Sequence, residues 1–413
     1  MALNMNRGTM TTDTHSSTQV RQMDPKMYRV MAENTRASFV SLLRLIGMRR
    51  SSGTSKGYAV GSKAKNVKSY KFEWEDFFPG SSISSLVIQG SPDAASLKAA
   101  TTLQVALGEG KQFQVNDLLM NKSTNEQMLV TAVNGDAVTV IRGWGTANQG
   151  VSGELLASND EIILVGNAWT EGTYSADPRS YNPRVAYNYT QIFKRAVENT
   201  GTNEEVETYG NVNKLQFQKQ EEWYQFLVER SRAYYTGKRV EYTDSNNGNR
   251  KKRTTAGLDS FIQSNIFTVN ADTLSYKNFM AFSKMVYRKG GAEKLLVCNS
   301  DFAQLVQEMV MDNKVQWAMS PKIKEFGINI KRLSCIHGDM DFMIDRTMDD
   351  LYAKPTAFAL ETDLIEEMIL RPDIWRPNVQ APDYDGRKDE IIGESGLKVI
   401  SEERHGKIII AGS

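Results

Sequence analysis

The chain has 413 residues, of which 40% are hydrophobic and 24% are charged, and its formal net charge is +1. This composition excludes disordered and fibrous classes, and the length predicts a main core with at least one further module. No run approaches the roughly 20 consecutive apolar residues that cross a bilayer, and residues 1–20 lack the apolar run of a signal peptide, so we expect no membrane contact and synthesis in a cytoplasm.

Residues 1–65 are predicted to form a flexible, basic arm. They mix Thr, Ser, Arg and Gly around one short helix, Phe39–Met48, whose apolar residues recur at helical spacing. The segment carries 11 Lys and Arg against 3 Asp and Glu, whereas residues 341–413 carry 16 acidic and 9 basic residues. A flexible basic arm contacts phosphates without reading sequence, or docks on an acidic neighbour. The candidates for this role are Arg21, Lys26, Arg29, Arg49 and Arg50.

A half-buried strand is predicted over Val67–Phe78, because Tyr70, Phe72 and Trp74 alternate with charged residues. A compact β-rich module follows over about 83–166. Its predicted strands are Phe113–Met120, Gln127–Val133, Asp136–Arg142 and Glu161–Val165. The pair Asn134–Gly135 predicts a two-residue type I′ hairpin turn.

A long helix is predicted over about 213–235, after a stretch rich in Pro and Tyr at Asp177–Tyr189. Its apolar residues lie on two sides, so we expect it to be sandwiched between layers. The polar run Thr243–Thr255 is predicted to be a mobile loop. The cations of Arg250–Arg253 within it are a weak signal for nucleic acid, and a solvated loop is the favoured interpretation.

Helices and strands then follow each other to the end of the chain. The predicted helices are Tyr276–Arg288, capped by Ser275, and Asp301–Met311, capped by Asn299 or Ser300. The predicted strands are Lys294–Cys298, Ile328–Leu333, Asp341–Ile344 and Ala357–Leu360. Helices beside a mixed sheet predict an α+β fold.

The sequence offers little catalytic chemistry. Its histidines, His15, His337 and His405, lie in the arm, a turn and the tail, so a histidine-centred triad is disfavoured. The motifs of nucleotide-binding loops and hydrolase elbows are missing. Pairs such as Glu366–Glu367 suit acid/base work, but surface or intersubunit charge is far more common. We therefore predict no enzyme activity, no catalytic residue and no cofactor.

A metal site is also disfavoured. Cys335, His337 and Asp339 resemble ligands, but a zinc site needs about four and a second pair is missing. Cys298 and Cys335, the two cysteines, are expected to be unpaired, buried small side chains.

Several phrases resemble a known family. Residues 130–135 (VTAVNG), 138–146 (VTVIRGWGT) and 165–172 (VGNAWTEG) are similar to tailed-bacteriophage major capsid proteins with a β-rich insertion in the extended loop. Residues 187–193 (YNYTQIF), 200–202 (TGT) and Tyr209–Gly210 follow in the family's order. The resemblance covers nearly the whole chain and implies the Hong Kong 97 fold.

The resemblance also implies a domain organisation. It assigns 1–65 to the N-terminal arm, 66–190 to the extended loop with its insertion at about 83–166, 257–355 to the axial domain, and 191–256 with 356–413 to the peripheral domain containing the spine helix at about 213–235.

The implied function is self-assembly of an icosahedral shell from hexameric and pentameric capsomers around double-stranded DNA, without sequence specificity. Portal, scaffold and decoration proteins are possible partners, and we expect noncovalent assembly. Candidate intersubunit contacts are Tyr70, Phe72, Trp74, Tyr181 and Tyr187. The alternatives are a tail or decoration protein and, from another class, a cytoplasmic nucleic-acid-binding protein or hydrolase.

Overall fold

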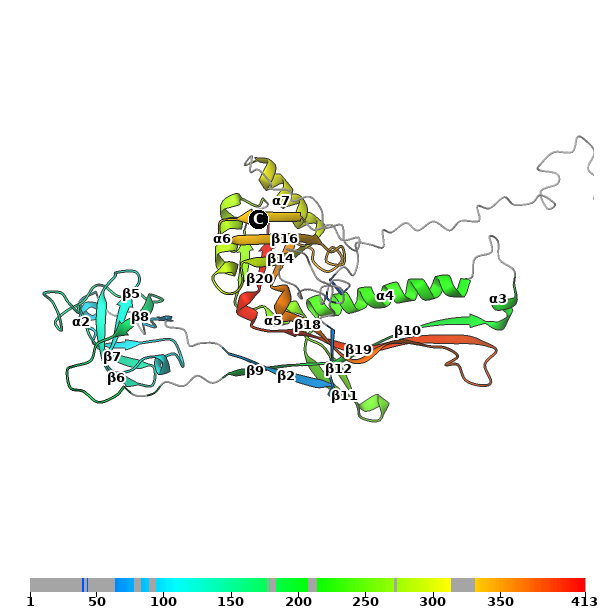
Figure 1. Cartoon of the computed structure of the whole chain (residues 1–413), viewed down its shortest axis with the longest axis horizontal. Coiled ribbons are helices and arrows are strands. Elements are labelled where there is room, and N and C mark those ends of the chain that lie inside the picture. The colour runs from blue at the N-terminus through cyan, green and yellow to red at the C-terminus, as the bar shows by residue number, and fades with distance from the viewer. Residues whose placement is uncertain are drawn as a thin grey trace, which may run out of the picture. The chain divides into compact units, whose positions relative to one another are not determined.

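The computed structural model describes residues 39–40, 43, 64–77, 83–88, 94–176, 178, 183–206, 214–270, 273–312 and 331–412. The chain divides into two compact units (Figure 1). Met1–Trp74 and Val185–Ser413 belong to the main unit, and Glu75–Arg184 forms the β unit. The predicted α+β class is confirmed, and the order of elements implied by the Hong Kong 97 resemblance is observed after the arm. The predicted domain limits remain predictions.

The β unit is a small closed barrel of antiparallel strands. Its sheet has the order β3 (Ile83–Ser85), β8 (Glu161–Asn167), β5 (Asp117–Asn121), β6 (Gln127–Asn134), β7 (Ala137–Ile141) and β4 (Thr102–Gln104). The two ends of this row meet, because Val87 N donates to Gln104 O at 2.8 Å and Ala106 N donates to Ser85 O at 3.0 Å. Closure pairs the strands that an open sheet would leave at its edges.

The barrel is filled by apolar side chains from every strand except β3, together with residues of its loops. The buried members are Leu86, Leu103, Val105, Phe113, Leu119, Met128, Val130, Val138, Val140, Leu156 and Ile162. A short helix, α2 (Ala94–Ala99), lies in the connection between β3 and β4. The strands predicted near 127–133, 136–142 and 161–165 are confirmed, whereas the strand expected from Phe113 begins only at Asp117.

The hairpin between β6 and β7 is confirmed, but the type of turn predicted for it is wrong. The strands pair up to Asn134 and Ala137, so the turn residues are Gly135 and Asp136. Only Gly135 of these has a positive φ, at 60°. A glycine with positive φ in the first central position is typical of type II′, whereas type I′ requires positive φ at both residues.

A four-stranded sheet spans the main unit. Its order is β1 (Ala64–Asn66), β18 (Ile365–Arg376), β19 (Gly386–Val399) and β10 (Gln191–Thr200). The register of β18 on β19 shifts on both sides of Arg371, and such bulges bend and twist a strand. Helix α3 (Gly201–Glu205) follows β10 at one end of this sheet.

Helix α4 (Lys214–Thr236) lies along β10 (Figure 1), and it confirms the long helix predicted at 213–235. The burial of its side chains increases toward its C-terminus. Residues 215–225 are half-buried or exposed, whereas Phe226, Tyr234 and Tyr235 are fully buried. The predicted sandwich therefore applies to the C-terminal half of the helix.

A second, six-stranded sheet forms the other part of the main unit. Its order is β13 (Ile266–Val269), β20 (Gly406–Ile410), β17 (Thr356–Leu360), β14 (Glu293–Cys298), β16 (Gly338–Ile344) and β15 (Lys331–Cys335). Helices α6 (Tyr276–Tyr287) and α7 (Ser300–Asp312) contribute Phe279 and Phe302 to the core on one face.

The central strand β14 is buried on both faces, which explains its uninterrupted apolar run. Leu296 and Cys298 belong to the core with α6 and α7, whereas Leu295 and Val297 belong to the core that contains the end of α4 and Leu258 of α5 (Leu258–Phe261). The helices and strands predicted for this region are confirmed within a few residues. Asn299 caps α7, since its Oδ1 accepts a hydrogen bond from Phe302 N at 3.0 Å.

Two ribbons complete the main unit. One pairs β2 (Lys71–Asp76) with β9 (Arg184–Tyr189), and the other pairs β11 (Val240–Asp244) with β12 (Arg250–Thr254). The second ribbon shows that the mobile loop predicted for Thr243–Thr255 is wrong. Opposite charges face each other across the two strands and stabilise the pairing. The polar composition alone does not show this pairing, so the segment was predicted to be a loop.

Phe39, Val40 and Leu43 are helical and buried in the core that contains Tyr235. Phe39 N donates a hydrogen bond to Asp345 Oδ2 at 3.1 Å. The other residues of the predicted helix, and the arm as far as residue 63, lie outside the described residues.

Candidate assembly surfaces

The predicted site residues are only partly covered by the structure. The arm cations Arg21, Lys26, Arg29, Arg49 and Arg50 and the aromatic Tyr181 lie outside the described residues. Their roles therefore stay predictions. Tyr70, Phe72, Trp74 and Tyr187 lie on or beside the β2–β9 ribbon.

Phe72 and Trp74 face the interior of the chain. Both are 8% exposed, and they form a small core with Met368. Tyr70, one residue before β2, is 43% exposed. An aromatic residue needs accessible area to anchor a neighbouring subunit, so Tyr70 is the stronger candidate for an intersubunit contact.

The structure brings Tyr70 and Tyr187 into one aromatic cluster through Tyr189, with ring centroids 6.4 Å and 5.8 Å from it. Two guanidinium groups stack on this cluster. Arg253 lies 3.8 Å from the centroid of Tyr70, and Arg239 lies 3.9 Å from that of Tyr187. Such cation–π contacts stabilise by roughly 0.5–1 kcal/mol each at exposed sites, and they hold the β11–β12 ribbon against the β2–β9 ribbon.

Asn188, fully buried on β9, fixes this ribbon to the main sheet. Its Nδ2 donates to Leu397 O at 2.7 Å and to Ala256 O at 3.2 Å, and its Oδ1 accepts from Ala256 N at 2.9 Å and Tyr189 N at 2.8 Å. A buried asparagine whose amide nitrogen and oxygen both make their hydrogen bonds holds the elements around it rigidly together. Sequence patterns carried no signal for this role, because the partners other than Tyr189 lie 68 and 209 residues away.

The β11–β12 ribbon presents an exposed face. Side chains of cross-strand partners share a face. The side that we call the outward face therefore holds Val240, Tyr242, Asp244, Arg250, Lys252 and Thr254. Val240 is 49% and Tyr242 57% exposed. The opposite side holds Glu241, which accepts from Arg253 Nε at 2.8 Å.

A buried charge network joins α4 to the main sheet. Arg230, with no exposed surface, donates to both carboxylate oxygens of Asp373 at 2.6 and 2.9 Å. Glu367 Oε1 lies 3.4 Å from Arg230 Nη1 and accepts from Tyr234 OH at 2.9 Å. The guanidinium also stacks on Phe226, 4.6 Å from the ring centroid. This network fixes the position of the helix on the sheet.

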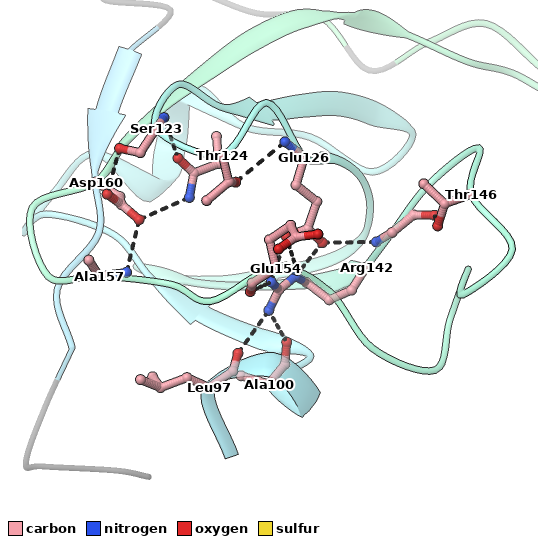
Figure 2. A network of polar contacts seen from close by, with 12 residues as sticks. Leu97, Ala100, Ser123, Thr124, Glu126, Arg142, Thr146, Glu154, Ala157 and Asp160 are labelled. Carbon is pink, nitrogen blue, oxygen red and sulfur yellow. Dashed lines mark hydrogen bonds and ion pairs between the residues drawn. The ribbon is translucent and has the colours of Figure 1, made fainter. Parts of the chain in front are cut away.

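The β unit has a buried ion pair of its own, shown in Figure 2. Arg142 donates from Nε and Nη2 to the two carboxylate oxygens of Glu126 at 2.7 and 2.6 Å, and both side chains are at most 3% exposed. Arg142 also donates to Leu97 O, Ala100 O and Glu154 O. Burial opposes ionisation, but the bonds from Arg142 and Gly143 N lower the pKa of Glu126 below its usual value. The pair ties α2 and the loop after β7 to the barrel.

His405, directly before β20, is fully buried in a neutral form. Its Nδ1 accepts from Glu361 N at 3.2 Å, and its Nε2 lies 3.2 Å from Ile400 O. Burial, together with the charges of Lys294 and Arg404, lowers the pKa of His405 to about 3. The ring acts as a structural connector between the end of β17 and the start of β20.

The described residues offer no grouping of three or more His, Cys, Asp or Glu side chains suited to a metal ion. Cys298 is a free thiol, and burial raises its pKa to about 12, so it stays protonated and unreactive at neutral pH. Cys335 is also free but only partly buried, contrary to expectation, because it ends β15 at an exposed turn. None of the described helices is both long and apolar enough to cross a membrane.

Solved structures similar to the chain include shell proteins. The capsid of Myoviridae phage XM1 matches 59% of this chain and 81% of its own, with 10% identity and a TM-score of 0.41. The capsid of a native GTA particle matches 60% of this chain and 81% of its own, with 11% identity and a TM-score of 0.42. The SrpI encapsulin of Synechococcus elongatus PCC 7942 matches 56% of this chain and 77% of its own, with 8% identity and a TM-score of 0.39.

A curated relative is the major capsid protein of Pseudomonas phage PaMx41, which is 34% identical over 103 residues. The match spans 25% of this chain and 23% of that protein's length. The family model of the SU10 major capsid protein matches residues 9–411. This match covers nearly the whole sequence, and the chain therefore belongs to the SU10 major capsid protein family.

Proposed function

We propose that this chain is the major capsid protein of a tailed bacteriophage and assembles itself into the icosahedral shell around the genome. The single observation that carries the proposal is the family match over residues 9–411. The shell consists of hexameric and pentameric capsomers held together without covalent links. The chain is made in the cytoplasm of the host and resides in the virion.

The exposed apolar side chains of the main unit support assembly. Tyr70, Val185, Ile192 and Tyr242 are each 43–57% exposed on strands or beside them. Large apolar and aromatic residues that stay accessible in one copy are typical of surfaces that a second copy covers. Together with Tyr181, the aromatic residues Tyr70 and Tyr187 are our candidates for these contacts.

The basic arm is proposed to face the packaged DNA or to dock on an acidic neighbour. An excess of positive charge in residues 1–65 neutralises phosphates without sequence specificity. Replacing Arg21, Lys26, Arg29, Arg49 and Arg50 by Gln should lower the DNA content of particles or impair arm docking. Particles of the variant with normal yield and normal genome content would rule out both roles.

Portal, scaffold and decoration proteins are proposed partners, whose contacts with this chain are to be found in the assembled particle. A tail or decoration protein, or a cytoplasmic nucleic-acid-binding protein or hydrolase, is the competing function. The SU10 match favours the shell protein over each of these, because the family is one of structural capsid proteins. We propose accordingly that the chain has no enzymatic activity.

The experiment is expression of the full chain, alone and together with a candidate scaffold protein. Size-exclusion chromatography and electron microscopy of the leading peak then follow. Closed shells, tubes or capsomer rings are the expected products. A chain that remains monomeric under every condition would contradict the proposed function.

A further inference from the structure

The β11–β12 ribbon is strongly basic. Residues 238–254 contain six Lys and Arg and two acidic residues, Glu241 and Asp244. Those two carboxylates pair with Lys251, Lys252 and Arg253. Lys238 and Arg250 are exposed and have no ion-pair partner within the part of the chain that the structure describes. The ribbon therefore keeps an excess of positive charge that its own acids do not balance.

Its outward face also carries accessible apolar area. β11 and β12 form a sheet of two strands, and Val240 and Tyr242 are about half exposed on this face. A two-stranded ribbon has little stability by itself, and the other side of this one is anchored by Arg253, which stacks on Tyr70. Accessible tyrosine beside arginine is the composition that protein interfaces favour.

An acidic surface lies at the end of the main sheet. We call Glu204, Glu205, Asp383 and Asp385 the acidic tip, and all four side chains are exposed. They come together because β10 and β19 pair as far as Thr200 and Gly386, and because Gly201 N contacts Asp385 O at 3.5 Å. Exposed apolar residues accompany them, with Val206 at 55% and Val379 at 41%.

The ribbon and the acidic tip lie at opposite ends of β10. Thr255 N, just after β12, donates to Gln191 Oε1 at the first residue of β10, whereas the tip follows its last residue. Figure 1 shows β12 and α3 at the two ends of this strand. Ten residues of extended strand span about 30 Å, so the two surfaces of one copy cannot pair with each other.

The geometry points to a head-to-tail contact in which the outward face of the β11–β12 ribbon docks on the acidic tip of a second copy of this chain. Opposite charge sets the orientation of the contact, and Val240 and Tyr242 bury apolar area against Val206 and Val379. A heterologous contact of this kind generates rings or closed shells when the rotation closes. The inference rests on the proposed function, because it specifies one contact of the assembled shell.

The test uses four variants of the full chain. The ribbon variant carries Lys238→Glu and Arg250→Glu, the tip variant carries Glu204→Lys and Glu205→Lys, and a third variant combines all four changes. The matched control carries Lys277→Glu and Lys284→Glu on α6, which has exposed lysines but is not part of either surface. Circular dichroism establishes that each variant is folded. Sedimentation velocity measures the assembled fraction at low and at high salt.

We expect the ribbon and tip variants each to lower the assembled fraction about tenfold at low salt, because like charges then face each other. The combined variant should return to within about twofold of the wild type, since the opposite charges are exchanged, and the control should assemble normally. If the ribbon variant is unfolded, Lys238→Gln with Arg250→Gln replaces it, with a loss of about threefold expected from neutralisation alone.

The two proposals fail in distinguishable ways. Wild-type chains that assemble while the ribbon and tip variants assemble equally well would overturn this contact and leave the proposed function standing. A combined variant as defective as the single-surface variants would also overturn it. Wild-type chains that never assemble would contradict the proposed function itself.

Discussion

The guanidinium of Arg230 on α4 and the carboxylate of Glu367 on β18 lie 3.4 Å apart, and neither side chain has any exposed surface. Asp373 accepts hydrogen bonds from Nη1 and Nη2 of the same guanidinium. Burying such an ion pair adds little to the free energy of unfolding, because the loss of hydration offsets the attraction between the charges. Removing one partner is strongly destabilising, because the other charge then stays buried without compensation. The packing of α4 on the sheet is therefore expected to be sensitive to the loss of either partner.

Replacing Arg230 by Ala should destabilise the main unit by about 3–5 kcal/mol, because the buried carboxylates of Glu367 and Asp373 would lose the guanidinium that pairs with them. The free energy of unfolding of the unassembled chain, followed in urea by circular dichroism, measures this loss. Arg232→Ala removes the exposed pair with Asp350 and is the matched control, expected to cost under about 1 kcal/mol. Equal losses for the two variants would contradict the role given to Arg230.

Asn188→Ala should cost about 2–3 kcal/mol, since it removes the buried hydrogen bonds that Asn188 makes to backbone groups of Ala256 and Leu397. Hydrogen exchange of the β2–β9 ribbon should rise in the same variant. Gln304→Ala, which removes an exposed bond to Glu308, provides the comparison. An unchanged exchange rate in the ribbon would show that Asn188 does not anchor it.

His405 makes stability depend on pH. The pKa of this ring is about 3 in the fold against 6.5 for an ordinary histidine, so between these values the unfolded chain binds a proton that the folded chain does not. The contribution of His405 to the free energy of unfolding is therefore fully present above pH 6.5. It is lost as pH falls below that value, with a slope of up to about 1.4 kcal/mol per pH unit. His405→Gln should flatten the dependence of the free energy of unfolding on pH in this window. Parallel curves for the wild type and His405→Gln would disprove the assignment.

In the β unit, Arg142→Met should leave Glu126 buried without this cation and should remove the hydrogen bonds that Arg142 donates to three carbonyl oxygens. Peptides from residues 94–176 should then exchange hydrogen faster by mass spectrometry, while those of the six-stranded sheet should not. Lys122→Met, which removes an exposed pair with Glu161, should leave both regions unchanged. Slow exchange in the Arg142 variant would show that the barrel does not depend on the pair.

Much of the fold could be predicted from local patterns. The hairpin of β6 and β7, the helices α4, α6 and α7 and the buried strand β14 all have a clear periodicity or turn signal. The long strands β10 and β19 were not predicted, since their mixed polar and apolar residues are stabilised by cross-strand partners that lie far away in the sequence. The β11–β12 ribbon was missed for a different reason. Its pairing depends on ion pairs of Glu241 and Asp244 with cations on the opposite strand, and a polar composition does not show these pairs.

The candidate surfaces were predictable only in part. Alternating aromatics correctly placed Phe72 and Trp74 on one strand, with Tyr70 just before its first residue, but alternation alone does not say which face is buried inside the chain. The anchors Asn188 and Arg230 gave no sequence signal, because a buried polar residue is recognised only by the distant groups that satisfy it.

The most direct measurement is a cryo-electron microscopy reconstruction of the particles that the full chain forms. The account predicts a closed shell of pentamers and hexamers in which every subunit contains α4 packed on β10 and the outward face of the β11–β12 ribbon meets the acidic tip of a neighbour. Particles without a subunit lattice, or a chain found only as a minor component attached to a shell built from another protein, would contradict it.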